Sequence, residues 1–296
     1  MNLHQLKIFL EAVKQMNYTR AGKELSLSQS AISIQISELE KSLGVKLFEQ
    51  IGKKLFLTEE GLTLEKWANK ILASVKDAEI AIYELKGLSK GHIHIGASTT
   101  IGSYILPELL CSYKKLYPGI EINIEIANTS VITEKIRKNE IDFALTGREI
   151  TDENLIVKPF IKDEIIPVSS PKNKICRKKK LSIKDIVKEP ILVRESGSAT
   201  RDALEKNLKK IGTACKFALE VGSTEALKRS VHNNLGISFI SRFAVLFEIQ
   251  NGYLIEIKLN DFKLTRQFYL VYLKEKYFSK AAGNFLEFIM NNSKNN

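Results

Sequence analysis

The chain has 296 residues, with 45 Lys and Arg against 34 Asp and Glu, which gives a formal net charge of +11 at pH 7. It has no run of the roughly 18 apolar residues that span a bilayer and no secretory signal at its start, so we expect a cytoplasmic protein without a membrane partner. Three widely spaced cysteines, Cys111, Cys176 and Cys215, argue against a disulfide framework and a C-x-x-C motif. The length predicts more than one domain.

The distribution of charge says little about a nucleic-acid partner. Residues 1–60 carry eight Lys and Arg against seven Asp and Glu, so this segment is nearly neutral. Much of the positive excess lies elsewhere, as in residues 172–180, where a solvated loop is the better interpretation. Evidence for a DNA partner must therefore come from the pattern of residues.

Residues 3–13 have apolar side chains at a spacing of three and four, which predicts a helix. We expect Thr19 to cap a second helix, and Ser28 to cap a third helix over residues 29–43. Two helices joined by a short turn, over about residues 18–37, form a helix-turn-helix, whose second helix enters the major groove of DNA.

The predicted third helix has an inward face of Ile32, Ile36, Leu39 and Leu43, and short polar side chains near its start on the other face. A Gln there can form a pair of hydrogen bonds with adenine, and such a pair favours the correct base over a wrong one by about 1–3 kcal/mol. Two short extended segments around Gly52-Lys53-Lys54 predict a β-wing whose lysines suit phosphate groups. The expected DNA-binding residues are Ser28, Gln29, Ser30, Ser33, Ile34, Gln35, Lys53 and Lys54. The spacing alone also fits a three-helix unit that binds no DNA.

Residues 6–9, 19–21, 27–36, 39–44, 47–48 and 57–61 together resemble the LysR-type transcriptional regulators. The resemblance implies a winged helix-turn-helix over residues 1–58 that binds an imperfect palindrome under the control of a small molecule. Three residues depart from the family pattern. Ser30 replaces a usual Pro, while Gln50 and Lys53 replace arginines that are usual in the wing. The wing therefore lacks the planar guanidinium groups whose forked N–H donors suit hydrogen bonds to base edges.

Residues 59–89 contain no Pro and carry a run of apolar residues at alternating spacings of four and three. This heptad seam predicts a helix that pairs with a second copy of the chain, and an amphipathic helix lying on its own domain is the alternative. The seam consists of Leu64, Ala68, Ile71, Val75, Ala78, Ile82 and Leu85. In the family this segment is the dimerising linker helix. The expected partners are double-stranded DNA at an inverted repeat, a second copy in a dimer, a tetramer of two such dimers, and RNA polymerase.

From residue 90 to residue 296, strands and helices alternate, as in residues 93–97 (strand), 101–116 (helix) and 120–126 (strand). This order predicts an α/β fold with a parallel sheet wrapped by helices. It resembles the two-lobed, periplasmic-binding-protein-like effector domain of the family. We expect lobe I over residues 92–161 and 268–291, and lobe II over residues 162–267.

Hydroxyl side chains follow several predicted strands and precede helices. Ligands of open α/β sheets bind at the carboxyl ends of strands, and helix N-termini bind anions, so we expect these hydroxyls to hold an effector between the lobes. Ordinary helix capping is the alternative for any one of them. Thr146 is included because it falls at the expected crossover between lobes. The expected effector-binding residues are Ser98, Thr99, Thr100, Thr129, Thr146, Ser196, Ser198, Thr200 and Thr224.

Residues 96–102, with Leu106-Pro107, resemble those of LysR-type members that regulate sulfur assimilation and carbon fixation. The resemblance implies a small oxyanion, or a small phosphorylated or carboxylated metabolite, as effector. We expect no cofactor and no metal, because His92 and His94 have no nearby Cys or His partner, and no enzyme, because nucleotide and nucleophile motifs are missing. A solute-binding sensory module and a structural nucleoid protein are the other classes considered.

Overall fold

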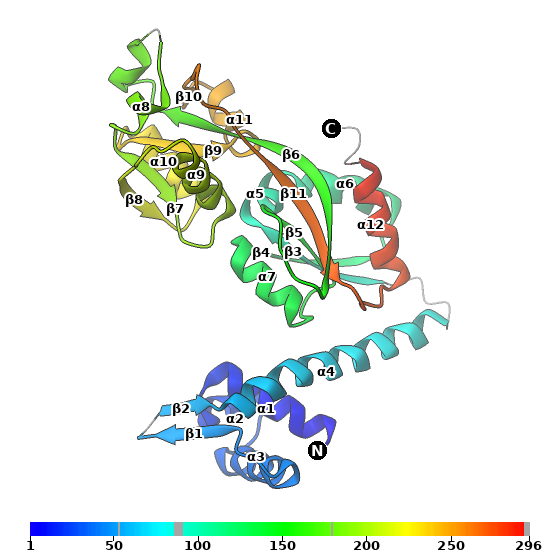
Figure 1. Ribbon diagram of the computed structural model, residues 1–296. Coiled ribbons are helices and arrows are strands. Elements are labelled where there is room, and N and C mark those ends of the chain that lie inside the picture. Colours follow the sequence, from blue (N-terminus) through cyan, green and yellow to red (C-terminus); the bar gives the residue numbers. More distant parts are fainter. Residues whose placement is uncertain (53, 86–90, 179, 293–296) are drawn as a thin grey trace. The chain divides into compact units, whose positions relative to one another are not determined.

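The computed structural model describes residues 1–52, 54–85, 91–178 and 180–292. The chain forms two compact units (Figure 1): an amino-terminal head and a larger carboxyl-terminal unit. No helix of the described residues is long and apolar enough to cross a membrane.

The head begins with three helices, α1 (Leu3–Gln15), α2 (Tyr18–Leu25) and α3 (Gln29–Leu43). Ser28 caps α3 as predicted, because its Oγ accepts a hydrogen bond from the Ala31 N–H at 3.1 Å. The prediction that Thr19 caps α2 is wrong. Asn17 has the extended backbone of a cap, and its Oδ1 accepts from the Arg20 N–H at 3.0 Å, so α2 starts one residue before Thr19.

The inner face of α3 buries Ile32, Ile36 and Leu39 in the core of the head. The fourth residue predicted for this face, Leu43, is exposed. Glu40, which follows Leu39 in the chain, is buried instead. The buried face of α3 therefore ends with a polar residue.

The Glu40 carboxylate positions the wing that follows α3. It accepts hydrogen bonds from Lys46 Nζ at 2.7 Å and from the Leu47 N–H at 2.9 Å. The wing is the antiparallel pair β1 (Phe48–Ile51) and β2 (Lys54–Leu57), in agreement with the predicted extended segments.

The long helix α4 (Glu59–Leu85) follows the wing. Ala68 is 0% exposed in the core of the head, and Leu64 and Ile71 pack against the same core. The structure therefore corrects the prediction that Ala68 lies in a dimer interface, and the first half of the seam instead fits the alternative of an amphipathic helix lying on its own domain. Ala78 and Ile82 are exposed, Val75 is half-buried, and the side chain of Leu85 lies outside the described part.

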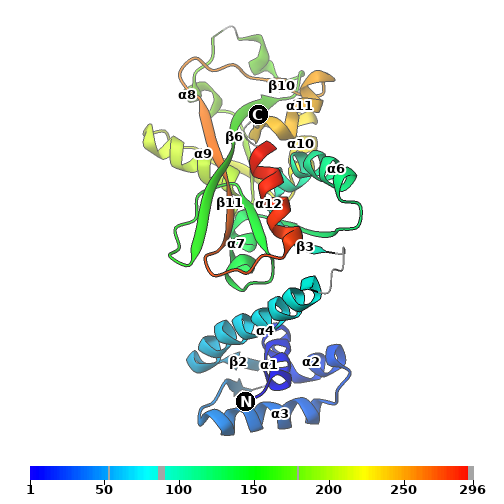
Figure 2. The ribbon, with the colours of Figure 1, turned by 90° about the vertical axis from the view of Figure 1, so that its right-hand side faces the viewer.

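The carboxyl-terminal unit is built on one sheet in the order β4-β3-β5-β11-β6-β9-β7-β8, with β10 paired to β6. Parallel strands form each end of this order, and the two long antiparallel strands β6 and β11 lie between them and run from one lobe to the other (Figures 1 and 2). The strands are β3 (His92–Ser98), β4 (Glu121–Ala127), β5 (Phe143–Thr146), β6 (Leu155–Ser169), β7 (Ile191–Arg194), β8 (Phe217–Val221), β9 (Ile237–Ser241), β10 (Ile255–Glu256) and β11 (Leu264–Leu273).

Helices cover both lobes. Lobe I contains β3, β4 and β5, and lobe II contains β7, β8, β9 and β10. The helices of lobe I are α5 (Thr99–Tyr104), α6 (Leu106–Leu116), α7 (Thr129–Arg137) and α12 (Lys280–Asn292). Those of lobe II are the short η1 (Lys174–Arg177) and α8 (Ile183–Ile186), then α9 (Ala199–Lys210), α10 (Thr224–His232) and α11 (Arg242–Gln250).

Two expectations for this unit are wrong. The single helix predicted over residues 101–116 is interrupted at Ile105, because Pro107 has no N–H for a continuous helical hydrogen bond. Thr146 is not at the crossover between lobes; it ends β5, and the crossing strands are β6 and β11. The lobe boundary expected at residues 161 and 162 accordingly falls inside β6.

Candidate effector cleft and DNA-binding surface

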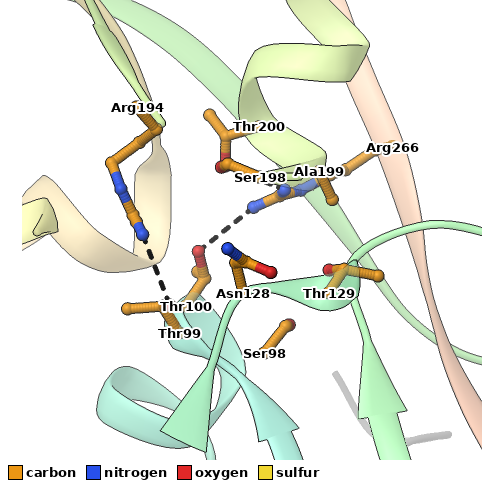
Figure 3. A pocket seen from close by; sticks show the side chains of 10 residues that line it. All are labelled: Ser98, Thr99, Thr100, Asn128, Thr129, Arg194, Ser198, Ala199, Thr200 and Arg266. Atoms are coloured by element: carbon orange, nitrogen blue, oxygen red, sulfur yellow. Dashed lines mark hydrogen bonds between the residues drawn. The ribbon is translucent and has the colours of Figure 1, made fainter. Parts of the chain in front are cut away.

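A polar cleft lies between the lobes at the carboxyl ends of β3, β4 and β7, where α5, α7 and α9 begin. The carboxyl ends of parallel strands meet at one edge of a sheet, so residues far apart in sequence come together there (Figure 3). The lining residues are Ser98, Thr99, Thr100, Asn128, Thr129, Arg194, Ser198, Ala199, Thr200 and Arg266.

Arg194, the last residue of β7, connects the two lobes across this cleft. Its guanidinium bonds the Glu195 carboxylate through Nε at 2.8 Å and Nη2 at 2.9 Å, and its Nη1 donates to Thr224 Oγ1. Nη2 also donates to Thr99 Oγ1 of lobe I at 3.5 Å. One buried side chain thus contacts the starts of α10 in lobe II and α5 in lobe I.

Arg266 reaches the cleft from β11, the crossing strand. Its Nε donates to the Asp163 carboxylate at 2.7 Å, its Nη1 to Thr200 Oγ1 at 3.0 Å, and its Nη2 to Thr100 Oγ1 at 3.3 Å. Thr200 belongs to lobe II and Thr100 to lobe I, so Arg266 also links the lobes (Figure 3). Removal from water lowers the pKa of this guanidinium, and Asp163 opposes that effect.

Ser98 has a buried hydroxyl with no hydrogen-bond partner among the described residues. The residue is 5% exposed and stands at the cap position of α5, yet its side chain makes no capping bond. Buried hydroxyls in native proteins nearly always find a partner, so an orphaned one indicates a ligand or a water at that place. Ser198 stands in the same position at the start of α9, also without a capping bond.

The chemistry of the cleft suits an anion. The starts of α7 and α9 present backbone N–H groups and the positive end of a helix dipole, and several hydroxyls surround them. The cavity has a volume of about 10 Å³, which is room for about one water molecule. A larger ligand therefore requires the groups that bridge the cleft to move apart.

The structure brings together six of the nine residues predicted for the effector, namely Ser98, Thr99, Thr100, Thr129, Ser198 and Thr200. The other three lie outside the lining. Thr146 is fully buried and donates to the Arg148 carbonyl, Ser196 is exposed, and Thr224 holds Arg194.

Sequence reasoning missed both arginines and Asn128 as lining residues. Arg194 and Asn128 each follow a predicted strand directly, which is a usable signal. Arg266 has no such signal, because its place depends on β11 crossing between the lobes.

The residues predicted to bind DNA lie along the outer side of α3 and at the wing. Ser28, Gln29, Ser30 and Ile34 are exposed, and Ser33 and Gln35 are half-buried. Ser28 Oγ, the capping atom, is 2.9 Å from Ser30 Oγ, so Ser30 extends the polar start of the helix.

The wing carries the departures from the family pattern. Lys54 is exposed on β2, and Lys53 lies outside the described residues. Gln50 Nε2 donates to the Gly52 carbonyl at 3.2 Å, so the amide at this position stabilises its own turn.

The family model described as "LysR substrate binding domain" matches residues 86–294, and the one described as "Bacterial regulatory helix-turn-helix protein, lysR family" matches residues 3–62. The chain belongs to the LysR family. The predicted family and fold class are thereby confirmed, and so is the role of a LysR-type transcriptional regulator with a DNA-binding head and an effector-binding domain. The match to the head favours this role over a solute-binding module without DNA function.

Relatives of this LysR-type regulator match over nearly their whole length. The HTH-type transcriptional activator CmpR of Synechocystis sp. is 33% identical over 97% of this chain and 94% of its own. A RuBisCO operon transcriptional regulator of Allochromatium vinosum is 30% identical over 98% of this chain and 95% of its own.

Solved structures agree with the fold. CbnR, a LysR family transcriptional regulator, covers 99% of this chain and 99% of its own at a TM-score of 0.71 and 18% identity. The regulatory domain of Synechocystis PCC6803 CcmR, solved in complex with 2-PG, covers 69% of this chain and 98% of its own at a TM-score of 0.65 and 26% identity.

Proposed function

We propose that this LysR-type regulator responds to a small metabolite with a phosphate or carboxylate group, bound between the lobes, and that it controls genes of carbon assimilation. The orphaned, buried hydroxyl of Ser98 is the observation that carries the proposal, because an oxygen atom of a ligand in the cleft would supply the hydrogen-bond partner that no described residue provides. The guanidiniums of Arg194 and Arg266, whose side chains are buried, and the starts of α7 and α9 supply further donors for oxygen atoms. The 2-PG complex of the CcmR domain and the RuBisCO operon relatives support the same class of effector.

A binding screen with the full-length protein tests this effector class. Inorganic phosphate, sulfate, 2-PG and shikimate are each titrated in a thermal-shift assay, and hits are measured by calorimetry. A ligand at 100 times its Kd stabilises the folded state by about 2.7 kcal/mol, so binding should raise the midpoint temperature of unfolding measurably. We expect 2-PG to give the largest shift. Equal shifts with uncharged glycerol would refute an anion site.

We propose that a dimer binds an inverted repeat through the outer side of α3 and the Lys54 wing, in the cytoplasm and without enzymatic activity. The exposed polar start of α3 supports DNA binding, and the exposed Ile82 on α4 supports dimerisation. Assembly into a tetramer and contact with RNA polymerase are further parts of this proposal.

Gln29→Ala is expected to weaken binding to the specific site about tenfold, as for one lost base contact, and to leave binding to random DNA unchanged. Equal weakening on both DNAs would mean that Gln29 contacts the sugar-phosphate backbone of the DNA and not a base.

A further inference from the structure

A second contact joins the lobes away from the lining of the cleft. The Tyr104 hydroxyl donates to Glu225 Oε1 at 2.5 Å. Tyr104 is the last residue of α5 in lobe I, and Glu225 lies in the first turn of α10 in lobe II. The ring of Tyr104 also packs against the apolar core of lobe II that contains Leu227 and Val231.

Lys228 fixes the lobe II side of this contact. Its side chain is 6% exposed, and its Nζ lies 2.7 Å from carboxylate oxygens of both Glu225 and Glu248. The same Nζ is 5.0 Å from the centroid of the Tyr104 ring, within the range of a cation–π contact. Burial and the bond to Glu225 raise the pKa of Tyr104 to about 12, so the hydroxyl keeps its proton at neutral pH.

The helices joined by this contact are also the helices joined at the cleft. α5 begins with Thr99 and ends with Tyr104, and α10 begins with Thr224 next to Glu225. Arg194 bonds both Thr99 and Thr224. The two helices are therefore tied at two places, once through Arg194 in the cleft and once through Tyr104.

We propose that Tyr104, Glu225 and Lys228 form a latch that holds the lobes together around the narrow cleft and thereby sets the affinity for the effector. The proposal rests on the proposed function of the cleft as the effector site. The cavity of about 10 Å³ is too small for a metabolite, so binding requires the lobes to separate locally. Interactions that favour the closed state reduce the fraction of molecules that can bind, and the apparent Kd rises in proportion.

Tyr104→Phe removes one hydroxyl and leaves the ring in place. We expect the Kd of the full-length protein for 2-PG, measured by calorimetry, to fall on the order of fivefold. Tyr117→Phe is the matched control, because this exposed tyrosine of lobe I lies outside the latch and should leave the Kd unchanged. An unchanged or weaker affinity in Tyr104→Phe would overturn the latch.

A double-mutant cycle separates the contact from other effects. Glu225→Ala should tighten binding like Tyr104→Phe, and the double variant should bind no tighter than the single variants, because both remove one interaction. Additive effects would mean that the two residues act independently and would overturn the proposal.

A second readout needs no effector and keeps the latch testable if 2-PG does not bind. Hydrogen–deuterium exchange of the unliganded protein should be faster over residues 99–104 in Tyr104→Phe than in wild type, and unchanged in Tyr117→Phe. Failure of wild type to bind any anion would count against the proposed effector class, whereas unchanged exchange in Tyr104→Phe would count against the latch.

Discussion

Arg266 and Asp163 lie directly opposite each other on the two strands that cross between the lobes, and they form a buried ion pair at 2.7 Å. Asp163 is 3% exposed and also accepts a hydrogen bond from Ser241 Oγ at 2.7 Å. Because the remaining donors of Arg266 reach Thr100 and Thr200, this one pair connects the centre of the sheet with the start of a helix in each lobe.

Removal of one member of the pair should be strongly destabilising. Arg266→Leu leaves the Asp163 carboxylate buried without its partner, which typically lowers the free energy of unfolding by about 3–5 kcal/mol. Denaturant unfolding of the full chain measures this change. Arg242→Leu is the control, because Arg242 is 41% exposed and its ion pairs with Glu164 and Glu256 are expected to contribute about 1 kcal/mol or less. Similar losses in the two variants would show that burial of the Arg266 pair has no special effect.

Ser98→Ala should separate effector binding from stability. The Ser98 hydroxyl has no partner among the described residues, so its removal should leave the free energy of unfolding unchanged or slightly higher. The same variant should weaken binding of 2-PG about tenfold, as expected for one lost hydrogen bond to a charged ligand. Ser230→Ala serves as control, because the Ser230 hydroxyl bonds the Ala226 carbonyl within α10. Unaltered affinity in Ser98→Ala would remove this residue from the effector site.

The features that the sequence predicted well depend on neighbours in the chain. The Ser28 cap, the hydroxyls of residues 98–100 after β3, and those of Ser198 and Thr200 at the start of α9 are local patterns, and the structure places the cap and these hydroxyls of the cleft as expected. Arg266 could not be assigned, because its partner Asp163 lies 103 residues away on another strand.

The errors in the prediction have the same physical origin. The periodicity of residues 101–116 fits a helix on both sides of Ile105, and only the missing N–H of Pro107 divides it. A heptad spacing identifies an apolar face but not what covers it. Ala68 is covered by the head of its own chain, which no spacing along α4 could reveal.

The exposed half of α4 gives a sharper test of dimerisation than the seam as a whole. Ile82 is 57% exposed in a single chain, so Ile82→Glu should leave the head folded and convert dimers into monomers in sedimentation experiments. Ala68→Glu is the contrasting variant, because a charge in the core of the head should destabilise the head itself. Dimers of unchanged stability in Ile82→Glu would exclude this face of α4 from the interface.

An ion-pair cluster on lobe I should produce a defined pH dependence of stability. Glu125 on β4 lies 2.7 Å from Lys135 Nζ and 2.9 Å from His94 Nε2. The hydrogen bond from Lys135 is the largest cause that holds the pKa of the Glu125 carboxyl below its usual value of 4.5; burial opposes this effect, and the charges of Lys135 and His94 add to it. A lowered pKa in the folded state means that the ionised form stabilises the fold above pH 4.5, and that this stabilisation is lost as the pH falls through the folded-state pKa.

Glu125→Gln should therefore unfold at a lower denaturant concentration than wild type at pH 6, and the difference should shrink as the pH is lowered from about 4.5 towards 3. Glu121→Gln is the control on the same strand, because the Glu121 side chain is 82% exposed and its contact with His92 is long, at 3.9 Å. Its difference from wild type should stay small throughout. A gap between Glu125→Gln and wild type that persists unchanged at pH 3 would mean that the amide acts through packing, and that the charge of Glu125 contributes nothing to the stability of lobe I.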